Sequence, residues 1–111
     1  MEASATKRYP VCPSADLEEG DVTDVKIDGR TYAVYRLADG LHATDGLCTH
    51  EQACLADGLV LDGELIECPK HNARFHIATG KAVRRPAKTD LAVYRAVEED
   101  GQVFIELPAP A

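Results

Sequence analysis

Short runs in which apolar and polar residues alternate, separated by Asp-Gly pairs, make up most of this 111-residue chain. In the run 31–37 the side chains at 32, 34 and 36 alternate with those at 33, 35 and 37, a period typical of a β-strand. Six of the eight glycines follow Asp, and Asp-Gly favours hairpin turns because both residues tolerate positive φ. The pattern predicts strands at 22–27, 31–37, 59–61, 64–67, 91–97 and 102–107.

The predicted strands are short and closely spaced, and no segment keeps a helical period. This arrangement is typical of a small antiparallel sandwich or barrel, so we predict an all-β fold. The length fits a single domain that covers residues 1–111. We expect residues 1–8 and 108–111 to be mobile ends.

Composition and charge narrow the class of protein. Hydrophobic residues make up 45% of the chain and aromatic ones only 5%, so we expect a core of Val, Leu, Ile and Ala. The N-terminal residues contain no apolar signal segment, and no stretch reaches the length of a membrane span. We therefore expect a soluble, cytoplasmic protein that does not bind a membrane. The net charge of −7 argues against nucleic acid as a partner, because its phosphates would be repelled.

Two segments each bring one thiol and one imidazole to a predicted loop. Cys48-Thr49-His50 lies in a loop at about 46–57, and Cys68-Pro69-Lys70-His71 lies in a loop at about 68–75. Two thiolates and two imidazoles suit a two-iron cluster in which one iron takes both sulfurs and the other takes both nitrogens. They also make up a Cys₂His₂ zinc set, although zinc fingers usually pair Cys with Cys and His with His.

Further segments extend the pattern beyond these two pairs. They are Cys54-Leu55-Ala56-Asp57-Gly58, Ile66-Glu67-Cys68-Pro69, Arg74-Phe75 and Ala78-Thr79-Gly80-Lys81-Ala82. Together with the pairs they resemble the Rieske [2Fe–2S] family over about residues 11–107, and above all its small ferredoxins of ring-hydroxylating oxygenase systems. The resemblance implies a Rieske-type sandwich or barrel with a two-loop subdomain that holds one [2Fe–2S] cluster. It implies Cys48 and Cys68 as ligands of one iron, and His50 and His71 as ligands of the other.

The resemblance also implies a function in electron transfer. A Rieske ferredoxin passes single electrons from a flavoprotein NAD(P)H reductase to a terminal non-haem iron oxygenase that attacks aromatic rings. The chain contains neither a Gly-rich nucleotide motif nor a second iron domain, so we expect a carrier and not an enzyme. We expect a monomer that forms short-lived complexes with both partners. The alternatives are a Rieske small subunit of a reductase complex, such as a nitrite reductase, and a structural zinc module.

Four positions in the two predicted loops predict a low reduction potential. High-potential Rieske proteins have a Ser and a Tyr where this chain has Ala73 and Phe75, and a disulfide where it has Ala53 and Lys70. Hydrogen bonds from such hydroxyls stabilise the reduced, more negative cluster. Without them we expect a potential near −150 mV, the lower end of the roughly −150 to +300 mV range of these clusters.

The remaining residues with ligand or redox chemistry are given structural roles. Cys12 and Cys54 have no His partner at ligand spacing, so we expect small buried apolar groups. We expect His42 and His76 to be surface histidines or hydrogen-bonded core histidines, not ligands. The tyrosines that we expect to pack on strands are Tyr32, Tyr35 and Tyr94.

Overall fold

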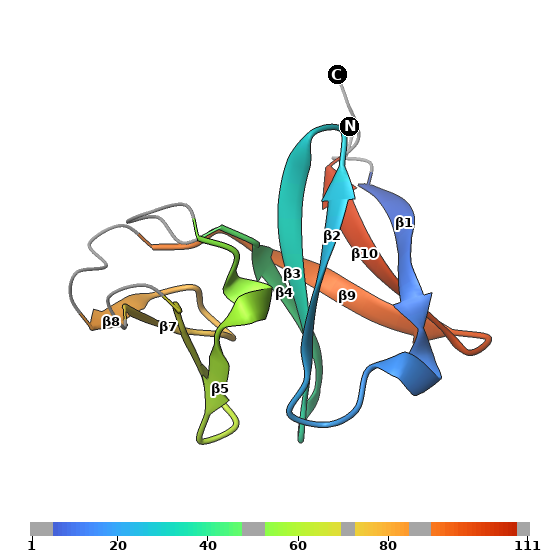
Figure 1. Ribbon diagram of the computed structural model, residues 1–111. Coiled ribbons are helices and arrows are strands. Elements are labelled where there is room, and N and C mark those ends of the chain that lie inside the picture. The colour runs from blue at the N-terminus through green and yellow to red at the C-terminus, as the bar shows by residue number, and fades with distance from the viewer. Residues whose placement is uncertain (1–5, 48–52, 70–72, 85–89, 109–111) are drawn as a thin grey trace.

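The computed structural model describes residues 6–47, 53–69, 73–84 and 90–108, which form two antiparallel sheets. The larger sheet has the strand order β1-β10-β9-β4-β3-β2, and its edge strands β1 and β2 come into contact, so it is nearly a barrel. The smaller sheet has the order β5-β6-β7-β8 and stands to one side of the larger one (Figure 1). The all-β prediction is confirmed.

The strands of the larger sheet are β1 (Thr6–Pro13), β2 (Val22–Ile27), β3 (Arg30–Leu37), β4 (Gly40–Asp45), β9 (Val93–Glu99) and β10 (Gln102–Pro108). Those of the smaller sheet are β5 (Leu59–Leu61), β6 (Leu65–Glu67), β7 (Arg74–His76) and β8 (Ala82–Arg84). Two short 3₁₀ helices, η1 (Ser14–Asp16) and η2 (Leu55–Asp57), follow β1 and precede β5. Within the described residues, no helix has the length and the apolar character needed to cross a membrane.

Three Asp-Gly pairs form the hairpin turns that the sequence predicts. Asp28, Asp62 and Asp100 have φ between 51° and 55°, and the glycine after each of them also has positive φ. Two successive residues with positive φ match the right-handed twist of the strands on either side. These turns join β2 to β3, β5 to β6 and β9 to β10.

Two other Asp-Gly pairs are not hairpin turns, which corrects the prediction. Asp45-Gly46 ends β4, and Asp57-Gly58 follows η2. At both positions glycine is needed because a neighbouring backbone comes too close for a side chain. A Cβ on Gly46 would lie 2.8 Å from the carbonyl carbon of Tyr32, and a Cβ on Gly58 would overlap the carbonyl oxygen of Glu67.

The ends of the chain also differ from the prediction. Residues 6–8, expected to be mobile, begin β1 and pair with β10, and Pro108 is the last residue of β10. The strands β1, β4, β7 and β8 lie outside the six predicted ranges. The segment that forms β1 contains Pro10 and Pro13, which are compatible with a strand here because β1 is an edge of the sheet. Residues 1–5 and 109–111 lie outside the described residues.

The alternation along β3 separates two hydrophobic cores. Tyr32 and Val34 point into the larger sheet, while Ala33 and Tyr35 point toward the smaller one, and all four are buried. The first core consists of Leu17, Tyr32, Val34, Ala43, Val103, Ile105 and Leu107. The second consists of Ala33, Tyr35, Leu37, Leu55, Ile66, Cys68, Ala73, Phe75, Ile77 and Leu91. One strand therefore connects the barrel to the subdomain that contains Cys68.

Candidate metal centre

The strands on either side of the second predicted loop, β6 and β7, are held together where the loop begins and ends. We call this closure, formed by residues 67, 68, 73 and 74, the neck of the loop. The N–H of Cys68 donates to the carbonyl oxygen of Ala73 at 2.7 Å. One residue further from the loop along each strand, Glu67 and Arg74 are paired, and Arg74 Nε lies 2.8 Å from Glu67 Oε2. An ion pair next to a backbone hydrogen bond holds β6 and β7 together where the loop begins and ends. Arg74, predicted to lie in the loop, instead begins β7.

The first predicted loop has a similar neck. The N–H of Gly46 donates to the carbonyl oxygen of Thr31 at 2.9 Å, and the N–H of Leu55 donates to the carbonyl oxygen of Gly46 at 2.9 Å. Leu47 and Cys54 form an antiparallel bridge. The chain between these two residues carries Cys48 and His50. Its two ends are thus fixed to each other and to β3.

The two necks lie against each other. Leu55, predicted to lie in the first loop, begins η2 and is fully buried in the same core as Ile66 and Cys68. Gly58 lies so close to Glu67 that only a hydrogen fits between them. The structure therefore brings the ends of two loops together that are far apart in sequence, as the two ligand pairs require.

Of the four predicted ligands, the structure describes Cys68. Its side chain is 1% exposed and lies in an apolar wall with Ala73 and Phe75, both fully buried. Cys48, His50 and His71 lie outside the described residues. Among the residues that are described, no three Cys, His, Asp or Glu side chains are grouped to hold a metal ion. The Cys68 thiol is buried among apolar side chains near the ends of both predicted loops. This place fits a cluster whose other ligands come from those loops.

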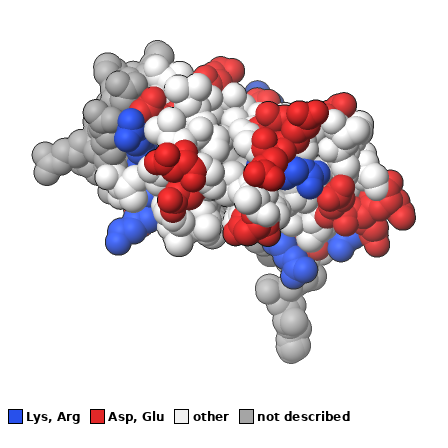
Figure 2. Space-filling view, turned by 90° about the horizontal axis from the view of Figure 1, so that it is seen from below, with Lys and Arg blue, Asp and Glu red and all other residues white. Residues whose placement is uncertain are grey.

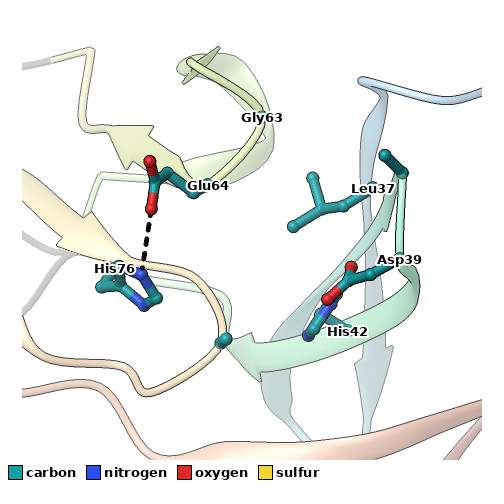
Figure 3. A pocket seen from close by; sticks show the side chains of 8 residues that line it. Leu37, Asp39, His42, Gly63, Glu64 and His76 are labelled. Atoms are coloured by element: carbon teal, nitrogen blue, oxygen red, sulfur yellow. Dashed lines mark hydrogen bonds and ion pairs between the residues drawn. The ribbon is translucent and has the colours of Figure 1, made fainter.

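His42 and His76 lie in a different place, a cavity of about 240 Å³ between the two sheets (Figure 3). His42 Nε2 is 2.8 Å from Asp39 Oδ1, and His76 Nε2 is 3.3 Å from Glu64 Oε1. The hydrogen bond with His42 lowers the pKa of Asp39. Each imidazole thus has a carboxylate partner. Both imidazoles are partly exposed as well, which agrees with the prediction of surface or hydrogen-bonded histidines.

The prediction for Cys12 and Cys54 needs correction, because both are only partly buried. Cys54 Sγ donates to Asp24 Oδ2 at 3.4 Å, so this thiol is a hydrogen-bond donor and not a purely apolar group. Burial raises the pKa of both thiols above its ordinary value. The prediction for the tyrosines is confirmed, since Tyr32 and Tyr35 are buried on β3 and Tyr94 packs edge-on against Tyr32.

The model of the family described as the Rieske [2Fe-2S] domain matches residues 7–95. This chain belongs to the Rieske [2Fe–2S] family. Its cofactor is therefore one [2Fe–2S] cluster, and the zinc alternative is wrong. The Rieske-type fold predicted from the sequence is confirmed as well.

Known Rieske proteins similar to this chain include small ferredoxins. A ferredoxin component of naphthalene 1,2-dioxygenase/salicylate 5-hydroxylase systems from Ralstonia sp is 41% identical over 92 residues, 83% of this chain and 88% of the relative. The Sphingomonas yanoikuyae B1 ferredoxin has a TM-score of 0.82 and 37% identity, over 92% of this chain and all of that one.

Two further solved structures bear on the choice of partner. A chain of the complex of reduced oxygenase and oxidized ferredoxin in carbazole 1,9a-dioxygenase has a TM-score of 0.81 and 34% identity, over 88% of this chain and 91% of that one. A putative NADH-dependent nitrite reductase small subunit from Mycobacterium tuberculosis has a TM-score of 0.82, but its 24% identity shows a shared fold only.

Proposed function

We propose that this Rieske protein is a one-electron carrier that accepts electrons from a flavoprotein NAD(P)H reductase and delivers them to a terminal aromatic-ring oxygenase. The observation that carries the proposal is the match to a ferredoxin component over 88% of that component's length, at 41% identity. The carbazole 1,9a-dioxygenase complex supports the terminal partner, because it joins a ferredoxin to an oxygenase. The nitrite reductase alternative has a likeness of fold alone in its favour.

We propose the four residues predicted from the sequence as the cluster ligands, with Cys48 and Cys68 on one iron and His50 and His71 on the other. When bound, the cluster accepts and releases a single electron. The burial of Cys68 supports its place on the side of the cluster that faces the protein interior, since its neighbours Ala73 and Phe75 keep water from the sulfur. The paired necks support the convergence of the two loops.

We propose further that the protein works in the cytoplasm as a monomer. Figure 2 shows acidic side chains in several groups across one face, with a few Lys and Arg between them. Together with the net charge of −7, this surface supports a soluble monomer, because a net charge far from zero opposes association. The same charged surface can steer protein partners toward this protein by electrostatic attraction.

The carrier function can be tested by substitution into a reconstituted naphthalene 1,2-dioxygenase system from which its own ferredoxin is omitted. We expect NADH-dependent hydroxylation that requires this protein and that stops when it is left out. The control is the same protein with its cluster removed by acid and the polypeptide refolded. Isolation from its source as a fixed subunit of a larger reductase would contradict the proposal and favour the alternative.

Ala73 and Phe75 predict the direction in which the potential can be moved. With both fully buried beside Cys68 and neither carrying a hydroxyl, we propose a midpoint near −150 mV. The double variant Ala73→Ser, Phe75→Tyr should raise the midpoint by about 50–100 mV. One hydrogen bond of ~1 kcal/mol to the reduced cluster corresponds to about 40 mV for one electron.

A spectroelectrochemical titration measures this shift. Ala78→Ser is the matched control, because it adds a hydroxyl at an exposed position that lines the cavity of His42 and His76. Its midpoint should equal that of the wild-type protein. An unchanged midpoint in the double variant would show that the missing hydroxyls do not set the potential here.

A further inference from the structure

Asp45, the last residue of β4, lies three residues before Cys48 and gathers bonds from other parts of the chain. Its Oδ1 accepts a hydrogen bond from the Tyr94 hydroxyl at 2.7 Å, and its Oδ2 accepts one from the N–H of Ala92 at 3.1 Å. Arg30 approaches Oδ1 at 3.7 Å. The side chain is 26% exposed, so these bonds are partly shielded from water.

The two hydrogen-bond donors to Asp45, Ala92 and Tyr94, belong to the segment that returns from the smaller sheet. Next to Ala92, the N–H of Leu91 donates to the carbonyl oxygen of Gly80 at 2.7 Å. The N–H of Gly80 in turn donates to the backbone carbonyl oxygen of His76 at 2.7 Å. His76 ends β7, the strand that leaves the second loop. Asp45 therefore connects the strand that enters the first loop to the segment that follows the second.

Backbone pairing alone makes this connection weak. The ladder between β4 and β9 has two paired positions, Ala43 with Tyr94 and Thr44 with Val93. The N–H of Asp45 adds one bond to Ala92, at 2.9 Å. The two carboxylate bonds extend this short ladder at the end nearest to the first loop. They replace strand pairing with side-chain bonds at the point where the loop begins.

A second chain of bonds ties the same point to the core around Cys68. The hydroxyls of Tyr35 and Thr44 are 2.8 Å apart, and the Thr44 hydroxyl donates to the carbonyl oxygen of Asp45 at 2.7 Å. Tyr35 and Thr44 are fully buried, and Tyr35 packs in the core that contains Cys68. The backbone of Asp45 is thus held from the core side and its carboxylate from the side of the returning segment.

We propose that Asp45 is a positioning residue that fixes the two ligand-bearing loops relative to each other, and so determines how firmly the cluster is held and how uniform its surroundings are. This inference rests on the proposed ligation by Cys48, His50, Cys68 and His71. Asp45 acts through the polypeptide and needs no contact with the cluster. Its effect should appear in cluster retention and in spectra before it appears in electron delivery.

The test compares Asp45→Asn with the wild-type holoprotein. An amide is uncharged and offers one acceptor oxygen in place of two, so both bonds lose their charge assistance and the amide nitrogen must donate to the Tyr94 oxygen. The combined weakening is on the order of one hydrogen bond, so we expect the visible absorption to bleach about fivefold faster in the presence of an iron chelator. The EPR signal of the reduced cluster should broaden, because the loops then sample more arrangements.

Asp100→Asn is the matched control. It removes the same charge in the exposed β9–β10 turn, where Asn tolerates the positive φ of 52°. Its bleaching rate and EPR line width should equal those of the wild-type protein. Tyr94→Phe removes one bond to Asp45 and leaves the charge, so it should accelerate bleaching less than Asp45→Asn does. If Asp45→Asn does not fold, Tyr94→Phe decides the question.

Failure of the inference can be told apart from failure of the proposed function. A wild-type protein that holds no [2Fe–2S] cluster would overturn the proposed ligation. A wild-type protein with its cluster, together with Asp45→Asn and Tyr94→Phe variants that bleach at the wild-type rate with unchanged EPR lines, would overturn the role of Asp45 alone.

Discussion

Replacing Cys68 with Ala should give a folded protein that has lost its [2Fe–2S] cluster. Each iron of the cluster needs two ligands from the protein, and Cys68 is proposed to supply one of the two thiolates on the first iron. The side chain is 1% exposed, so water cannot take the place of the sulfur. Iron and acid-labile sulfide, each about two per chain in the wild-type protein, should fall to background. The visible absorption of the cluster should disappear with them.

The other cysteines provide matched controls for this loss. Cys12 and Cys54 are half-buried and belong to neither ligand pair. Cys12→Ala and Cys54→Ala should therefore keep their iron and sulfide. Cys54→Ala removes a thiol that bonds Asp24, so we expect at most a small loss of stability. Retention of the cluster in Cys68→Ala would contradict the assignment, and so would an equal loss in all three variants.

Gly58→Ala should cost roughly 3 kcal/mol or more in the free energy of unfolding. A Cβ at this position would overlap the Glu67 carbonyl oxygen and come 3.2 Å from that of Leu55, and both are backbone atoms that cannot rotate away. The φ of Gly58 is −91°, which any residue can adopt, so the cost comes from the overlap alone. The two necks would have to separate, and we expect the cluster content to fall as well. Denaturant unfolding followed by far-UV circular dichroism measures the change.

Gly63→Ala separates this overlap from the ordinary cost of removing a glycine. Gly63 has a φ of 67°, which Ala adopts at a cost of about 1 kcal/mol, but a Cβ there meets no atom within 4 Å. It should therefore be destabilised less than Gly58→Ala and keep its cluster. Equal stability of the two variants would mean that the loop necks are not in contact.

Several features of this protein can be predicted from neighbouring residues alone. The alternation along 31–37 predicts a strand because its period comes from the geometry of consecutive residues. The hairpins at Asp28, Asp62 and Asp100 follow from the φ preferences of two adjacent residues. The two Cys–His pairs, the predicted ligands, are visible for the same reason, since a Cys and a His two or three positions apart belong to one loop.

Local patterns are misleading where a distant segment decides the conformation. Gly46 and Gly58 have the same Asp-Gly signal as the hairpins, yet they are needed for close approach to Tyr32 and Glu67. The strand β1 was missed because it contains two prolines and is paired with β10 at the other end of the chain. Its edge position, which makes the prolines acceptable, depends on the completed sheet.

The sequence by itself determined the class of fold and the type of cofactor, and it singled out two Cys–His pairs as the predicted ligands, because these depend on residue type and on short spacings. Tertiary structure alone decided how the two loops are held together. Asp45 bonds to residues 47 and 49 positions away, and no local period marks such a contact. The burial of Cys68 and the fit of Gly58 against Glu67 likewise exist only once the sheets have packed.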